Sequence, residues 1–551
     1  MTSLAEPTPI ATPEDFPVDW DDPSDAALHW TWDQMHTPRP ICPLGRDLMP
    51  FAFATGMTAG FRESGAPIKE RRLRFVNTFL YAAMIPDLAL LPDTPARMQS
   101  IVAERGPDMY QRWLDVYLPE VQATNERLRS YAYTAAGDTE LRAFIDETLP
   151  ALARMWEIHF LLMPGFMISA GFKNFCAHRL GLTALEAFEM MQGAPNMSVE
   201  SGSTLWRLAH GAPASVQDMI ATQSADDALA YLRETAEGRA FLAALAEYLA
   251  VYGWRKGHFD VIGPAWAEAP ALALDQVRLL LRAPTDPAED QQRGAERAEQ
   301  AAAACRQRLA DDPAALAEFD ALYQIVKRYP QLQENHNFYI DQTFMALLRL
   351  PFLEAGRRMA ARGQIDDAEE YAYLRLDEIR DALGGDTTPH HDAVAERRTE
   401  MERWQSYLPP QAIGTPPPAG AASDFESDFF GAPVEPSRDP RVVQGLPGSR
   451  GVATGVARVV RTLTEADQIE EGDILVCEMT TPAWTPLFAG LAGIVADSGG
   501  PLSHCAIVAR EFDIPAVVGT RLGTRLIPDG ARITIDGGQG VVRIESYPTS
   551  P

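Results

Sequence analysis

The segment with the clearest chemical potential is residues 497–519, DSGGPLSHCAIVAREFDIPAVVG. An apolar strand is expected to end at its start, where Gly499 and Gly500 let the backbone turn tightly and expose its N–H groups. Ser503 is a good helix N-cap, so His504 is predicted to lie in the first turn of a helix. The free N–H groups and positive dipole of a helix start attract anions. A neutral imidazole placed there could accept a phosphoryl group and have the new negative charge stabilised.

A small α/β domain at residues 448–546 is predicted to position this segment. Short apolar runs bounded by Gly, Pro and Asp indicate strands, namely GVARVV, DILVCE, AGIVAD, IPAVVG and ARITID. One helix, from His504 to about Phe512, is expected between AGIVAD and IPAVVG. The GGQG at 537–540 is expected to join ARITID to VVRI as a hairpin.

The region before this domain has a different pattern. Residues 28–408 are predicted to form a helical acceptor-binding domain, because segments such as LRAFIDETLPALARMWEIHFLL repeat apolar residues at helical spacing. Strands do not alternate with helices in this pattern, which argues against a TIM barrel or a Rossmann sheet. Residues 1–27 are expected to be an acidic disordered tail, and the Pro- and Gly-rich residues 409–447 a linker. The predicted fold class is a large, mostly α-helical domain followed by a small α/β domain.

Composition narrows the possible partners. The chain has 551 residues and a formal net charge of -28, which argues against binding nucleic acid or an anionic membrane. Its five cysteines form no CxxC pair, which suits a reducing cytoplasm. The apolar stretch 155–172 contains Glu157, His159 and Pro164, so buried helices are expected there rather than a membrane span. The first residues lack the basic and apolar regions of a signal peptide.

SGGPLSHCAIVAREFDIPAVVG resembles the signature of the mobile, swivelling phosphohistidine domain of phosphoenolpyruvate-utilising enzymes. That family includes pyruvate phosphate dikinase, phosphoenolpyruvate synthase, rifamycin phosphotransferase and phenylphosphate synthase. The preceding GVATGVARVV and GDILVCEMTTPAWTPLF match the domain in order, so the resemblance covers about residues 445–544. It implies that His504 carries a phosphoryl group; the alternative is a structural histidine at a helix end. The predicted phosphate-binding residues of this domain are Gly499, Gly500, Ser503 and Arg510.

The helical region resembles the substrate-binding region of rifamycin phosphotransferase and of phenylphosphate synthase-type proteins. The matching pieces are WTWDQMHTPRPICPL (30–44), MQGAPNMSVESGSTLWRLA (191–209), YGWRKGHFDVIGPAWAEAP (252–270) and ENHNFYIDQTFMALLR (334–349). Family members often have GHR where this chain has GWR at 253–255, which leaves the contact made by that histidine open.

The segment ENHNFYID gathers Glu334, His336, Tyr339 and Asp341 within two turns of a predicted helix. Glu334, Phe338 and Asp341 have the spacing of one helix face, and buried carboxylates beside aromatic rings are unusual unless they serve a site. These residues are predicted to line an acceptor cavity. His336 could accept a proton from a substrate hydroxyl, the alternative being a histidine that caps or bridges helices.

Arg255 and His258, in YGWRKGHFD, could steady a transferring phosphoryl group; a solvated basic turn is the alternative. Trp254 and His36 complete the predicted substrate-binding residues. Whether a metal is bound stays open.

The chain shows no P-loop, since GLPGSRG at 445–451 lacks the GxxxxGK[ST] pattern, and we find neither an ATP-grasp domain nor a phosphoenolpyruvate-binding barrel. Phenylphosphate synthase-type systems place the ATP-grasp part on a separate subunit. The resemblance therefore implies a cytoplasmic, heteromeric phosphotransferase of aromatic compound catabolism. In it, a partner uses ATP and Mg²⁺ to phosphorylate His504, which then passes the group to a phenolic hydroxyl. The alternatives are an antibiotic phosphotransferase of the rifamycin type and a non-enzymatic phosphorelay protein.

Overall fold

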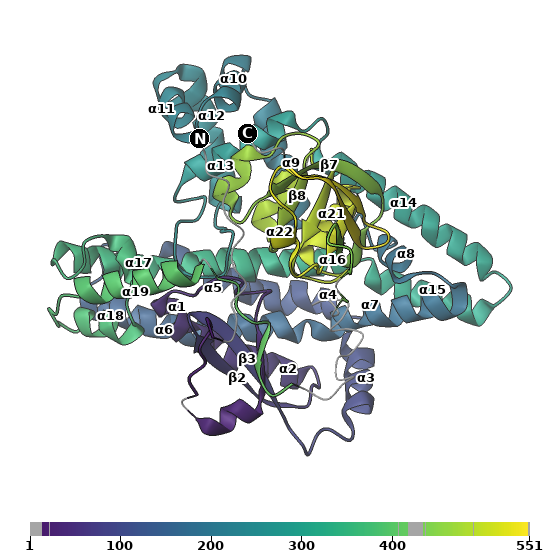
Figure 1. Ribbon diagram of the computed structural model, residues 1–551, viewed down its shortest axis with the longest axis horizontal. Coiled ribbons are helices and arrows are strands. Elements are labelled where there is room, and N and C mark those ends of the chain that lie inside the picture. Colours follow the sequence, from purple (N-terminus) through teal and green to yellow (C-terminus); the bar gives the residue numbers. More distant parts are fainter. Residues whose placement is uncertain are drawn as a thin grey trace. The chain divides into compact units, whose positions relative to one another are not determined.

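The computed structural model describes residues 14–20, 22–405, 407–416, 434–435, 437–488 and 490–548. The chain divides into two compact units. Unit 1 comprises Met1–Gly165, His258–Gly263 and Tyr339–Ala421; unit 2 comprises Phe166–Gly257, Pro264–Phe338 and Ala422–Pro551. The expected fold class, a large helical part followed by a small α/β domain, is confirmed (Figure 1). The helical region 28–408, expected as one domain, is instead shared between the two units.

Unit 1 contains an antiparallel sheet, which the helical pattern of residues 28–408 did not predict. Its strand order is β2-β3-β1-β4, with β1 at His29–Trp32, β2 at Ile68–Val76, β3 at Phe79–Pro86 and β4 at Ala412–Gly414. The turn between β2 and β3 has Asn77 and Thr78 at φ 49° and 74°. Such left-handed turns match the twist of a hairpin, and asparagine tolerates them well. Figure 1 shows α2 (Met57–Glu63) beside this hairpin.

Unit 1 also contains the helices that precede and follow these strands in the chain. They are η1 (Pro23–Ala27), α1 (Pro43–Met49), η2 (Pro50–Gly56), α2, α3 (Thr94–Arg105), α4 (Met109–Arg112), η3 (Trp113–Tyr117), α5 (Leu118–Ser130), α6 (Asp138–Leu161), α17 (Met345–Ala361), η6 (Ala368–Tyr373), α18 (Leu376–Leu383) and α19 (His391–Gln405). Two further helices cross from one unit to the other, α7 (Met163–Phe175) and η5 (Asn337–Phe344).

Part of the expected N-terminal tail is ordered. Phe16 is buried, and its ring lies 6.2 Å from that of Phe79 and 5.5 Å from that of Trp404. Asp25 is also buried and accepts a hydrogen bond of 2.7 Å from Arg74 on β2. Residues 14–20 and 22–27 are therefore held by an aromatic core and an ion pair, whereas residues 1–13 lie outside the described part.

Unit 2 combines a helical array with the C-terminal α/β domain. Its helices before that domain are η4 (Cys176–Leu180), α8 (Ala184–Glu189), α9 (Met197–His210), α10 (Ala214–Thr222), α11 (Ala225–Glu234), α12 (Ala236–Tyr252), α13 (Pro270–Arg282), α14 (Pro287–Arg308), α15 (Pro313–Val326) and α16 (Tyr329–His336). Leu279 of α13 is buried in one cluster with Trp484 and Phe488 of the C-terminal domain. The helical array therefore contributes directly to the core of that domain.

The C-terminal domain is an eight-stranded sheet in the order β5-β12-β11-β7-β8-β9-β10-β6. Its elements are β5 (Val442–Gln444), β6 (Leu446–Ser449), β7 (Val452–Val459), η7 (Leu463–Gln468), β8 (Ile474–Cys477), η8 (Pro482–Phe488), β9 (Gly493–Ala496), α21 (His504–Glu511), β10 (Ala516–Val518), α22 (Gly523–Leu526), β11 (Arg532–Asp536) and β12 (Val541–Ser546). Strands β7 to β10 are parallel, and the predicted β11–β12 hairpin and the helix from His504 are both present.

The expected linker, residues 409–447, is shorter than predicted. Its first part forms β4, which pairs with β1, and its last part forms β5 and β6 of the C-terminal sheet. Apolar side chains explain the difference, because Val443 is buried in the domain core and Leu446 packs against it. Residues 417–433 lie outside the described part of the chain.

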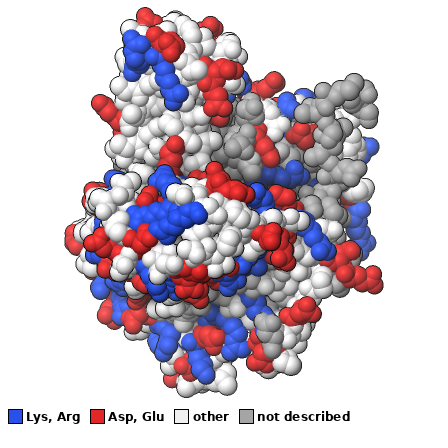
Figure 2. Space-filling model, turned by 90° about the vertical axis from the view of Figure 1, so that its left-hand side faces the viewer, with Lys and Arg blue, Asp and Glu red and all other residues white. Residues whose placement is uncertain are grey.

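The face shown in Figure 2 carries acidic and basic side chains intermixed, within a chain of net charge -28. One helical run, Asp138–Leu180, is long and apolar enough to cross a membrane by length and composition, and 56% of its apolar window is buried inside the protein. The core helix of a soluble protein meets the same criteria.

Candidate functional site

His504 begins helix α21, as its sequence context predicts. Strand β9 ends just before Asp497, whose buried carboxylate accepts hydrogen bonds from Thr520 and Thr524. Burial raises the pKa of Asp497 to about 6. Gly499 adopts φ 93°, a left-handed conformation that favours glycine, and so permits the turn into the helix.

Ser503 has the extended backbone of an N-cap residue, but its side chain makes no capping bond. Its Oγ is buried without a hydrogen-bond partner among the described residues. The hydroxyl therefore lies beside His504 with its hydrogen-bonding capacity unused.

The His504 imidazole is held by a carboxylate from the helical array of unit 2. Nδ1 of His504 lies 2.8 Å from Oε2 and 3.0 Å from Oε1 of Glu334. The Oγ of Ser198 donates to Oε2 of Glu334 at 2.5 Å. Glu334 is fully buried and His504 is only 7% exposed. A carboxylate can only accept hydrogen bonds, so Nδ1 carries the proton and Nε2 the lone pair.

Nε2 of His504 is buried and has no hydrogen-bond partner within the described residues. The sequence alone did not predict that Ser198, Glu334 and His504 are joined by hydrogen bonds. It assigned Glu334 to an acceptor cavity and did not single out Ser198. Ser198 lies in the first turn of α9, where the Asn196 side chain caps the helix by accepting from the Val199 N–H at 3.0 Å. The start of α9 is joined to α16 by the N–H of Met197, which donates to Oδ1 of Asn335 at 3.0 Å.

Arg510 and Glu511 of α21, and Gly500 before it, make hydrogen bonds within the protein. Arg510 was expected to bind phosphate, but it donates to the carbonyl oxygens of Gly448 and Pro501 at 2.6 and 2.8 Å. Burial lowers the pKa of its guanidinium to about 10. Glu511 accepts from the N–H of Gly193 at 3.0 Å, and burial raises its pKa to about 8. Gly500 contributes its carbonyl, which accepts from the N–H of Ser503 at 3.0 Å.

Arg255 is 1% exposed, so the alternative of a solvated basic turn is wrong. It donates to the carbonyl of Tyr252 at 2.6 Å and to the hydroxyl of Tyr248 at 2.8 Å, and it also bonds Ser201. Its guanidinium lies 4.5 Å from the centre of the Trp266 ring. Burial lowers the pKa of Arg255. This residue therefore belongs to a buried hydrogen-bonded network in unit 2.

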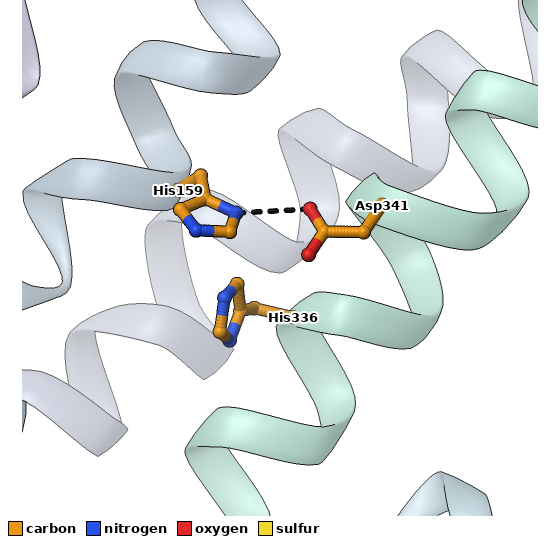
Figure 3. Close-up of side chains that lie close together, drawn as sticks. All are labelled: His159, His336 and Asp341. Atoms are coloured by element: carbon orange, nitrogen blue, oxygen red, sulfur yellow. Dashed lines mark hydrogen bonds and ion pairs between the residues drawn. The ribbon is translucent and has the colours of Figure 1, made fainter. Parts of the chain in front are cut away.

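The ENHNFYID segment starts in α16 and continues as the π-helix η5. A π-helix has wider turns than an α-helix, so the predicted shared face of Glu334, Phe338 and Asp341 rested on the wrong period. Glu334 bonds His504 in unit 2, whereas Asp341 lies 2.9 Å from Nδ1 of His159 in unit 1. Figure 3 shows this second pair, with His336 on the helix that carries Asp341.

His336 is fully buried, and its Nδ1 bonds the carbonyl of Leu332 at 3.0 Å. Phe338 is buried, Tyr339 and Trp254 are half-buried, and His258 and His36 belong to unit 1. Nδ1 of His36 lies 2.8 Å from Oδ1 of Asp33.

The cavities we describe lie elsewhere. A cavity of about 690 Å³ in unit 1 is lined by charged residues that include Glu104, Arg105 and Arg154. A cavity of about 10 Å³ in unit 2 is lined in part by Tyr329 and Arg510. None of the four ENHNFYID residues predicted to share an acceptor cavity lines either of these two.

Comparison with known families places both halves of the His504 contact in matched segments. Residues 469–540 match the family described as "PEP-utilising enzyme, mobile domain", and residues 157–334 match "Rifampicin phosphotransferase fourth domain". His504 lies in the first segment, and Glu334 is the last residue of the second.

Similar proteins extend beyond these segments. The chain is 34% identical over 559 residues to Chondramide synthase cmdD of Chondromyces crocatus, covering 97% of this chain and 14% of that protein. It is 33% identical over 368 residues to the uncharacterized phosphotransferase YvkC of Bacillus subtilis (strain 168), covering 65% of this chain and 43% of that protein. It is 31% identical over 343 residues to the rifampicin phosphotransferase of Streptomyces sviceus, covering 60% of this chain and 37% of that protein.

The chain thus spans less than half the length of each of these relatives. It carries a mobile domain of the PEP-utilising enzymes and a rifampicin phosphotransferase fourth domain, and its homologues are rifampicin phosphotransferase-like.

Proposed function

We propose that this chain is the acceptor-binding and phosphohistidine component of a cytoplasmic, ATP-dependent phosphotransferase, and that Nε2 of His504 carries the phosphoryl group. One observation carries the proposal. The buried carboxylate of Glu334 accepts from Nδ1 of His504 and leaves Nε2, with its lone pair, without a partner among the described residues. A histidine whose other nitrogen is bonded to a carboxylate is oriented and made more basic, which suits a nucleophile.

The phosphoryl donor in this proposal is a nucleotide-binding ATP-grasp partner that uses Mg²⁺-ATP. The acceptor is a hydroxyl, and a phenolic hydroxyl is the version we favour, because the sequence pieces around the helical region resemble the phenylphosphate synthase type. Transfer in two steps through His504 avoids placing nucleotide and acceptor in one site.

A rifamycin-type antibiotic acceptor is the second candidate. The observation in its favour is the 31% identity to a protein named rifampicin phosphotransferase. Both candidates share the chemistry at His504 and differ only in the hydroxyl that receives the group.

The test uses phosphoramidate, a small reagent that phosphorylates histidine without a protein donor. We expect the full chain to acquire an acid-labile, base-stable phosphoryl group on Nε2 of His504, identified by mass spectrometry and by its ³¹P chemical shift. His504→Gln should not be labelled. The matched control is His210→Gln, which removes a half-buried histidine stacked on Trp206 in the same unit. Labelling that persists in His504→Gln, or a wild-type chain that stays unlabelled while a histidine peptide reacts, would contradict the proposal.

A further inference from the structure

A second histidine in unit 1 is also fixed by a carboxylate. Nδ1 of His36 lies 2.8 Å from Oδ1 of Asp33, and the other carboxylate oxygen accepts from Nη2 of Arg71 at 2.7 Å. Burial alone would raise the pKa of Asp33, but the charges and hydrogen bonds of His36 and Arg71 hold it well below its usual value. An ionised Asp33 makes Nδ1 of His36 the donor, and in the neutral form of the imidazole Nε2 of His36 then has the lone pair. We find no partner for that nitrogen among the described residues.

Aromatic rings surround this imidazole. The ring centre of His36 lies 5.2 Å from that of Phe53, 5.3 Å from that of Trp156 and 5.8 Å from that of Phe259. The ring of His159, which is paired with Asp341, lies 6.4 Å away and stacks on Trp156. We call Asp33, His36, Phe53, Arg71, Trp156 and His159 the His36 cluster; all six belong to unit 1.

Two buried donors of the His36 cluster have no acceptor among the described residues. They are Nη1 of Arg71 and Nε1 of Trp156. Arg71 is 7% exposed and lies over the Phe53 ring at 5.3 Å, while Trp156 is fully buried with its ring 4.5 Å from that of Phe53. Buried polar groups are nearly always hydrogen-bonded, and a guanidinium N–H left alone is costly. Their packing on the same phenylalanine indicates that a polar partner belongs among these rings.

We propose that the His36 cluster binds the hydroxyl-bearing aromatic acceptor and that His36 is the general base for its hydroxyl. The inference rests on the proposed function and names the part of unit 1 that serves it. A phenolic oxygen can accept from Arg71 or Trp156 while its proton is donated to Nε2 of His36, and the rings of Phe53 and Trp156 suit an aromatic ligand.

In the transfer step the substrate oxygen forms the bond to phosphorus. The N–P bond breaks, and its electron pair stays on Nε2 of His504. The hydroxyl proton passes to Nε2 of His36, and the resulting imidazolium is stabilised by Asp33.

The probe is 4-nitrophenol, whose absorbance reports loss of its hydroxyl proton. With the full chain, at a pH below the ionisation of the free phenol, binding should produce the phenolate absorbance. The matched ligand 4-nitroanisole, which lacks the hydroxyl, should bind without an absorbance change. His36→Gln should abolish the absorbance change and weaken binding of 4-nitrophenol about tenfold, as expected for a lost hydrogen bond to a charged group.

Trp156→Phe is the second variant, because it keeps an aromatic ring and removes the indole N–H together with the rest of the five-membered ring; we expect about fivefold weaker binding. His210→Gln in unit 2 is the control and should behave as wild type. The proposal is overturned if 4-nitrophenol does not bind the wild-type chain, or if His36→Gln and Trp156→Phe both bind it with unchanged affinity and absorbance.

Phosphoramidate labelling of the same variants separates this inference from the proposed function. His36→Gln should be labelled on His504 like wild type, because His504 carries the phosphoryl group whereas His36 acts only on the acceptor hydroxyl. Labelling of His504 without phenol binding would reject the His36 cluster alone. Phenol binding that depends on His36 without labelling of His504 would reject the phosphohistidine proposal and leave the binding site standing.

Discussion

Glu334→Gln is the sharpest test of how His504 is prepared for phosphoryl transfer. The substitution keeps the side-chain size at a fully buried position and removes only the charge that accepts from Nδ1 at 2.8 Å. A hydrogen bond to a charged group contributes about 1.5–3 kcal/mol and a neutral one about 1 kcal/mol, so the variant loses roughly 1–2 kcal/mol. That difference corresponds to roughly a 5- to 30-fold change in rate or in tautomer ratio.

Two measurements follow from this estimate. ¹⁵N NMR of histidine-labelled protein should show Nδ1 of His504 as the protonated nitrogen in wild type. In Glu334→Gln both tautomers should be populated, because an amide can accept or donate. Phosphoramidate labelling of His504 should slow by the same factor. Faster labelling with an unchanged tautomer would mean that Glu334 only shields the imidazole, and the orienting role would be refuted.

Glu511→Gln is the matched control for that experiment. Glu511 is as deeply buried in unit 2 as Glu334, but it bonds the backbone N–H of Gly193 rather than His504. Its pKa is raised to about 8, so at neutral pH the amide closely imitates the protonated acid. We expect wild-type labelling of His504 in this variant.

Three further outcomes are expected. His504→Ala should abolish labelling. It should also lower the free energy of unfolding by about 1–3 kcal/mol in urea titrations, because the buried Glu334 carboxylate loses the imidazole as a hydrogen-bond partner. An unchanged stability would show that this contact contributes nothing. Because the pKa of Glu511 is raised from 4.5 to about 8, the unfolded state ionises first as the pH rises, and stability should fall between pH 4.5 and 8. The loss is about 5 kcal/mol at most, and Glu511→Gln should show a correspondingly flatter pH dependence of urea unfolding. Finally, calorimetry should detect no micromolar binding of Mg²⁺-ATP by this chain alone, and a clear isotherm would reveal a nucleotide site that the sequence did not indicate.

The C-terminal domain was predictable because its signals are local. Short apolar runs, a double glycine and a serine before His504 specify a strand, a turn and a helix start within a few residues. The Glu334 contact was not predictable in this way, since it joins residues 170 positions apart and depends on how α16 packs against α21. Sequence placed Glu334 among site residues, but it could not say which group Glu334 would face.

The sheet of unit 1 was missed for a related reason. The segment KERRLRF in β2 is rich in residues that favour helices, and only its pairing with β3 makes it a strand. Strands β1 and β4 pair although Trp30 and Ile413 are hundreds of residues apart, and neither strand is long enough to give a clear alternating pattern. Similarly, the π-helix η5 changes the period within one helical run, which a fixed helical spacing cannot anticipate.

The order of the C-terminal sheet has a mechanical consequence. Strands β5 and β6 occupy its two opposite edges, yet only Gly445 separates them in the chain. Gly445 is packed so closely that an added Cβ would lie 2.6 Å from a methyl group of Val517. The sheet must therefore curl until its two edge strands lie next to each other, as in a closed barrel. A force that pulls on the chain before Val442 cannot detach one edge strand alone, because residues 442–449 form both edge strands of the sheet. A force applied there acts on both edge strands of the sheet at once.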